Sequence, residues 1–183
     1  NTIAQGEVLQ LLNINDANTS EERYIEVIYG KTACLFEAAT QIGAILSSSD
    51  EQTEQALKSY GKHLGMAFQL IDDALDYTAN PNELGKNVGD DLAEGKPTLP
   101  LIYAMQQGDD TQQALIRHAI ENGGLNHIDA ITQIIHSTGA LEYTYQQAIS
   151  EADMAKRAIK VLPESEHKQA LNFLADYSVD RNH

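Results

Sequence analysis

Basic residues are scarce in this chain: 12 lysines and arginines stand against 27 aspartates and glutamates, and the formal net charge is -15. Because a phosphate backbone is itself polyanionic, a chain this acidic is not expected to bind nucleic acid. It also offers no polybasic patch for a membrane surface. The 183 residues are nevertheless enough for one domain with a sizeable core.

Cysteine and long apolar runs are lacking as well. The one cysteine, Cys34, cannot form an internal disulfide, and its apolar neighbours predict a small core residue rather than a nucleophile. Glu37 interrupts the longest apolar stretch, residues 32–46, so no transmembrane segment is expected. No signal peptide is recognisable at Asn1. These absences favour a cytoplasmic protein.

The apolar periodicity predicts an all-α protein, because helical spacing recurs and no strand-like alternation stands out. The expected helices are residues 1–12, a helix from a Thr19–Glu22 capping box to Leu46, a helix from a Ser48–Glu51 capping box to Pro81, and further helices with breaks near Gly108, Gly123 and Gly139. Residues 80–100, rich in glycine and charge, are too irregular for a long helix, and loops of this length are usually functional or disordered. An apolar stripe over residues 141–162, continued by Ala170, Phe173, Leu174 and Tyr177, predicts core or interface positions.

Three aspartates stand within an apolar helical segment, residues 68–77. Asp72, Asp73 and Asp76 project from one side of the predicted helix, with Gln69 one turn earlier. Two unit charges about 4 Å apart repel by roughly 4 kcal/mol at an effective dielectric near 20, so the cluster requires a positive partner. Carboxylate ligands favour a hard ion, above all Mg²⁺, which completes its shell with water and phosphate oxygens. The alternative, a solvated acidic face, is disfavoured by the apolar neighbours.

Two lysines, Lys86 and Lys96, each follow a glycine in the expected loop, with Asp90 and Asp91 between them. Lysine is a compact point charge suited to phosphate, and flanking glycines allow a loop to close over a bound group. Two loop lysines alone are usually solvated. Directly after the aspartate-bearing helix, they are expected to bind a diphosphate.

Lys31 and Thr32 follow Gly30 and imitate part of a P-loop, but the Walker pattern requires glycine where Ile25 stands, and no strand precedes it. A lysine and a threonine inside an apolar helix still need partners. A phosphate in the bundle cavity is one explanation. The other is that Lys31 reaches solvent while Thr32 bonds back to its own helix.

Taken together, the motifs resemble those of the trans-polyprenyl diphosphate synthases. They are Gly30-Lys31-Thr32, Phe68-Gln69-Leu70-Ile71-Asp72-Asp73-x-x-Asp76 and the glycine-rich segment 85–98, in the family's order. The resemblance covers essentially all 183 residues and is strongest to bacterial octaprenyl members. It implies an isoprenoid-synthase helical bundle, usually a homodimer. Such enzymes elongate an allylic prenyl diphosphate with isopentenyl diphosphate, here to octaprenyl diphosphate for quinone side chains.

The resemblance also implies roles for individual residues: Asp72, Asp73 and Asp76 for Mg²⁺, Lys31, Thr32 and Gln69 for the allylic substrate, and Lys86 and Lys96 for its diphosphate. Ionising an allylic diphosphate requires preorganised cations and a water-poor cavity, and it needs no protein nucleophile.

Two departures from the family pattern qualify this interpretation. Glu7 stands where the family usually has glutamine. The family's first aspartate-rich motif and its isopentenyl diphosphate site belong upstream of Asn1. We therefore expect residues 1–183 to be the C-terminal part of a single synthase domain, without its N-terminal helices and inactive alone. The alternatives are a noncatalytic subunit of a heteromeric prenyl synthase and a terpene cyclase.

Overall fold

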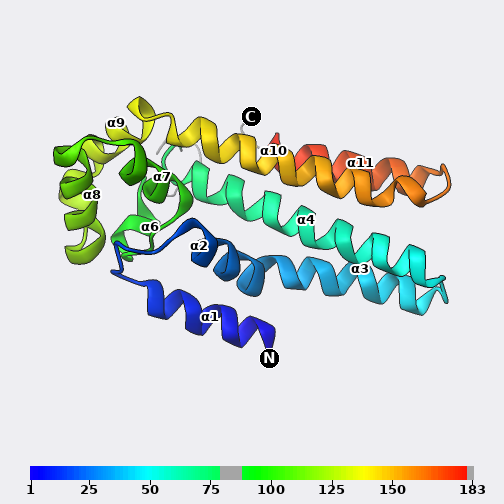
Figure 1. Ribbon diagram of the computed structural model, residues 1–183. Coiled ribbons are helices and arrows are strands. Elements are labelled where there is room, and N and C mark those ends of the chain that lie inside the picture. The colour runs from blue at the N-terminus through cyan, green and yellow to red at the C-terminus, as the bar shows by residue number, and fades with distance from the viewer. Residues whose placement is uncertain (79–87, 181–183) are drawn as a thin grey trace. The chain divides into compact units, whose positions relative to one another are not determined.

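The computed structural model describes residues 1–78 and 88–180 (Figure 1). This part of the chain is helical and contains no strand, which confirms the all-α prediction. The helices are α1 (Thr2–Asn13), α2 (Glu21–Ile28), α3 (Cys34–Leu46), α4 (Glu51–Leu75), α6 (Asp90–Ala93), α7 (Leu99–Gln107), α8 (Asp110–Asn122), α9 (Ile128–Ser137), α10 (Ala140–Ala158) and α11 (Glu166–Val179), together with a π-helical turn η1 (Tyr29–Ala33) and the 3-10 turns η2 (Leu125–His127) and η3 (Ile159–Val161). In the described residues, no helix has the length and apolar character needed to cross a membrane.

The chain divides into two compact units. The first consists of Asn1–Gly6, Ile28–Ile71 and Gln146–His183, and the second of Glu7–Val27 and Asp72–Tyr145. Each of the two units has a hydrophobic core of its own.

The core of the first unit joins α4 to α10, η3 and α11. Tyr60, Ala155, Ile159 and Ala175 form its buried cluster. The Tyr60 hydroxyl donates a hydrogen bond of 2.7 Å to the carbonyl oxygen of Leu171. The apolar stripe predicted for residues 141–162 is therefore inward-facing in its C-terminal part.

The stripe on α11 was predicted to occupy core or interface positions. Phe173, Leu174 and Tyr177 are 65%, 47% and 55% exposed, so they are not core residues, and the interface alternative stays a prediction. The ammonium of Lys168 explains this orientation, because it donates to Glu164 at 2.7 Å and to the carbonyl of Leu162 at 2.8 Å. These bonds turn the Lys168 side of the helix inward.

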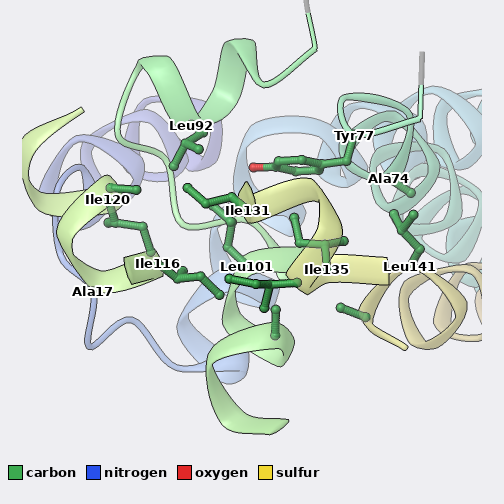
Figure 2. Close-up of a cluster of buried hydrophobic side chains, with 14 residues drawn as sticks. Ala17, Ala74, Tyr77, Leu92, Leu101, Ile116, Ile120, Ile131, Ile135 and Leu141 are labelled. Carbon is green, nitrogen blue, oxygen red and sulfur yellow. The ribbon is translucent and has the colours of Figure 1, made fainter. Parts of the chain in front are cut away.

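The core of the second unit is built from the end of α4 and from α6 to α10 (Figure 2). Figure 2 shows Tyr77, Leu92, Leu101 and Ile131 gathered in one cluster. The helix breaks expected at glycines are all present: α7 ends before Gly108, α8 before Gly123 and α9 before Gly139.

Neither helix is capped by the residue that was predicted to cap it; a neighbouring residue forms the cap in both cases. Helix α2 begins after Ser20, whose hydroxyl accepts from the backbone N–H of Arg23, while the Thr19 hydroxyl donates to the carbonyl of Asp16. Helix α4 is capped by Asp50, which accepts from the N–H of Thr53 at 2.8 Å. In each case a better-placed oxygen lies close by in the chain and serves as the cap.

The long helix expected up to Leu46 is interrupted by the π-helical turn η1, which carries Lys31 and Thr32. Such single turns inside α-helices are frequent at functional sites. Helix α4 approaches this turn closely at Gly65, where a Cβ atom would lie 2.6 Å from the Cα of Ala33. Glycine at position 65 therefore allows the contact between α4 and η1.

We predict that Gly65→Ala lowers the free energy of unfolding by about 1–3 kcal/mol, because the added methyl group meets the backbone of η1 and overpacks this contact. Gly43→Ala is the matched control. It changes a helical glycine of α3 whose added Cβ would meet no atom within 4 Å, so a gain of about 0.5–1 kcal/mol is expected. Urea denaturation measures both. Equal effects of the two substitutions would contradict the close approach.

Candidate functional site

Of the three aspartates predicted as metal ligands, Asp72 and Asp73 lie in the last turn of α4 and Asp76 directly follows the helix, all within the second unit. Asp73 is buried, only 3% exposed, whereas Asp72 and Asp76 are half-buried. Burial of carboxylates is costly unless donors or cations compensate them. The hydrogen-bond donors that contact Asp73 and Asp76 are therefore central to the site.

Asp73 is held by a tyrosine that the sequence analysis did not single out. The hydroxyl of Tyr24, on α2, donates a hydrogen bond of 2.6 Å to Asp73 Oδ2, and Tyr24 itself is 4% exposed. Burial, followed by the charge of Asp73, raises the pKa of Tyr24 well above its usual range. A buried tyrosine usually requires a hydrogen-bond partner, but only the tertiary structure shows that Tyr24 is buried and that Asp73 is its partner.

Asp76 is held by backbone groups. Its Oδ1 and Oδ2 accept from the N–H groups of Asp90 and Asp91 at 3.2 and 3.1 Å, so the carboxylate caps the short helix α6. Gly89 precedes this helix with φ 83°, a left-handed conformation that favours glycine. Burial raises the pKa of Asp76 to about 6, the charge of Asp91 adds to this, and the two N–H groups oppose it.

Lys96, predicted to bind a diphosphate, also lies in the second unit. Its ammonium forms ion pairs with Asp91 at 3.1 Å and Glu94 at 2.6 Å. Burial lowers the pKa of Lys96, but the bonds to Glu94 and Asp91 outweigh this effect, and the pKa lies above its ordinary value. Asp91 therefore links two predicted site residues, since its N–H binds Asp76 and its carboxylate binds Lys96. Lys86 lies outside the described residues.

The predicted substrate contacts of the first unit are Lys31, Thr32 and Gln69. The structure brings two of them together, because the Thr32 hydroxyl donates a hydrogen bond of 2.8 Å to Gln69 Oε1. Thr32 therefore has a partner on α4. Lys31 is half-buried in η1.

Within residues 1–78 and 88–180, no three histidine, cysteine, aspartate or glutamate side chains form a group that could hold a metal ion. The donor chemistry nevertheless fits a hard cation. Burial, and after it the negative charge of Asp91, raises the pKa of Asp76, and a divalent ion beside the carboxylate would offset both effects. Mg²⁺ usually takes only one or two protein carboxylates and completes its shell with substrate phosphates and water. The metal role of Asp72, Asp73 and Asp76 stays a prediction.

We predict a pH dependence of folding from Asp76 in metal-free buffer. Its pKa of about 6 in the folded state exceeds the ordinary value of 3.8, so the folded state binds the proton more tightly than the unfolded state. The contribution of Asp76 to stability is therefore fully present below about pH 4 and is lost as the pH rises through about 6. Urea denaturation across this range should show the stability of the wild type falling relative to Asp76→Asn.

Asp50→Asn is the control of opposite sign. Hydrogen bonds from the Thr53 hydroxyl and N–H lower the pKa of Asp50, so its contribution is lost as the pH falls. A difference between wild type and Asp76→Asn that does not change with pH would contradict the shift at Asp76.

Comparison with known proteins identifies the family. The family model for polyprenyl synthetase matches residues 1–138. The chain is 56% identical to octaprenyl diphosphate synthase of Haemophilus influenzae, covering 100% of this chain and 56% of the relative. It is 51% identical to octaprenyl diphosphate synthase of Escherichia coli, covering 100% of this chain and 57% of the relative. The chain thus spans little more than half the length of these relatives.

Solved structures of prenyl synthases are similar to this chain over nearly its whole length. A polyprenyl synthase from Caulobacter crescentus, complexed with calcium and isoprenyl diphosphate, matches with a TM-score of 0.93 and 41% identity, over 100% of this chain and 56% of that one. A geranylgeranyl pyrophosphate synthase from Corynebacterium glutamicum, complexed with isoprenyl diphosphate and magnesium, matches with a TM-score of 0.89 and 29% identity, over 99% and 52%. This chain has the all-α isoprenoid-synthase fold and belongs to the polyprenyl synthetase family.

Proposed function

We propose that this chain contributes to a trans-prenyltransferase, which elongates an allylic prenyl diphosphate with isopentenyl diphosphate. The observation that carries the proposal is in the second unit, where Asp91 connects the aspartate-bearing end of α4 to Lys96. Carboxylates for a divalent ion and a lysine for phosphate thus belong to one hydrogen-bonded network. A metal–diphosphate complex requires both kinds of group.

In this proposal Asp72, Asp73 and Asp76 hold Mg²⁺, which when bound neutralises the diphosphate and stabilises it as a leaving group. Lys96, together with Lys86, binds the diphosphate oxygens. In the first unit, the side chains of Lys31, Thr32 and Gln69 are assigned to the allylic substrate. Preorganised positive charge and exclusion of water then favour ionisation and head-to-tail condensation without a protein nucleophile.

The finer assignments rest on the relatives. Two relatives that cover the whole chain are named octaprenyl diphosphate synthases, which supports an octaprenyl product and, through it, a role in quinone side chains. We also infer a homodimer in the cytoplasm, as the resemblance to the family implies.

We infer that residues 1–183 are part of a single synthase domain and are inactive alone. The sequence contains one D-D-x-x-D motif, at residues 72–76, and the chain covers 56% of the Haemophilus relative. Apolar residues on α3 support this inference, since Leu35, Ile42, Ile45 and Leu46 are 52%, 53%, 54% and 80% exposed. An apolar face of this kind is typical of a surface that further helices or another chain would cover.

We predict that Mg²⁺ and farnesyl diphosphate bind this chain together in a calorimetric titration. Asp72→Asn should weaken binding by at least about 10-fold, because even the outer-shell partners of a metal site are worth about that much. Asp110→Asn is the control. It removes an exposed carboxylate in the first turn of α8, and binding should stay within about 2-fold of the wild type.

An elongation assay with labelled isopentenyl diphosphate completes the test. Binding without elongation is the expected result and supports a partial site. Elongation would show that the chain is catalytically sufficient. An absence of binding by a folded wild type would overturn the metal–diphosphate assignment and favour a noncatalytic subunit, whereas cyclic hydrocarbon products would indicate a terpene cyclase.

A further inference from the structure

The hydroxyl of Tyr24 donates a hydrogen bond to the carboxylate of Asp73. Both residues belong to the second unit and are almost fully buried, with exposures of 4% and 3%, and the oxygens are 2.6 Å apart. They are 49 positions apart in the sequence, on α2 and α4. The bond therefore fixes the carboxylate of one predicted metal ligand from a different helix.

A hydroxyl in this position restricts rotation of the carboxylate about its χ angles, so that less order has to be gained when a metal binds. The restriction is effective here because both side chains are buried and the hydroxyl and the carboxylate oxygen are 2.6 Å apart.

We propose that Tyr24 is a positioning residue for Mg²⁺ binding, and that its hydroxyl holds the Asp73 carboxylate in the orientation that the ion requires. The proposal rests on the proposed function, which assigns Mg²⁺ to Asp72, Asp73 and Asp76. Asp76 is oriented by backbone N–H groups, which no side-chain substitution removes. Asp73 is oriented by a side chain, and the contribution of that side chain can be measured.

The alternative is that the bond only ties α2 to α4. Tyr60 provides a matched control for this role, because it is also fully buried and also donates one hydrogen bond, of 2.7 Å. Its acceptor is the backbone carbonyl of Leu171 rather than a carboxylate. Tyr24→Phe and Tyr60→Phe therefore remove the same hydroxyl group from equally buried rings.

The experiment titrates Mg²⁺ into each variant of the 183-residue chain in the presence of farnesyl diphosphate, and records thermal unfolding without metal. Tyr24→Phe should raise the Kd for Mg²⁺ by about 10-fold, as the loss of an outer-shell partner does, and Tyr60→Phe should leave it within about 2-fold. Both variants should unfold at lower temperature than the wild type. At saturating Mg²⁺, Tyr24→Phe should recover the wild-type affinity for farnesyl diphosphate.

Equal Mg²⁺ affinities in Tyr24→Phe and Tyr60→Phe would overturn the positioning role while leaving the proposed function intact, provided that Asp72→Asn still weakens binding. A weaker affinity for farnesyl diphosphate that excess Mg²⁺ does not restore would also overturn it. An absence of Mg²⁺ binding by the wild type would overturn the proposed function and this inference together. If Tyr24→Phe unfolds under the assay conditions, the comparison is made at low temperature in the Gly43→Ala background.

Discussion

Negative charge at the end of α4 is the constraint on which the second unit depends. Asp73 is buried and Asp76 is half-buried, and each accepts hydrogen bonds from another element: Asp73 from Tyr24 on α2, and Asp76 from the first N–H groups of α6. The carboxylate of Asp76 also positions the chain that follows it. Asp76 caps the N-terminus of α6, α6 carries Asp91, and the carboxylate of Asp91 forms an ion pair with Lys96.

The first unit depends on close packing rather than on charge. Gly65 brings α4 against the π-helical turn, where a larger side chain would collide with the backbone at Ala33. In the same pair of elements, the Thr32 hydroxyl reaches Gln69. The π-helical turn η1 and Gly65 thus act together. The turn presents polar side chains within an apolar helix, and Gly65 allows α4 to approach them.

The sequence was sufficient for the helical class, the glycine breaks and the helix that carries the aspartates, because these follow from local periodicity. It was insufficient where neighbouring groups compete. Ser20 and Asp50 cap helices that were predicted to begin with Thr19 and Ser48. Periodicity identified the apolar stripe of α11 but left open whether it lies in the core or at an interface; in the structure the side of α11 that carries Lys168 faces inward. The partner of Tyr24 lies 49 residues away, so only tertiary structure reveals it.

If a diphosphate and a divalent cation bind in the second unit, as proposed, the charges there favour joint binding of the two. Lys96 is already neutralised by Asp91 and Glu94, so its charge is not available to a diphosphate without cost. The pKa of Asp76 is raised by burial and by Asp91, which shows that added negative charge is unfavourable at this place. A diphosphate alone would add further repulsion, and a cation alone would complete its shell with water instead of phosphate oxygens. The cation lowers the repulsion that the diphosphate meets, and the diphosphate supplies ligands to the cation, which is the physical basis of coupled binding.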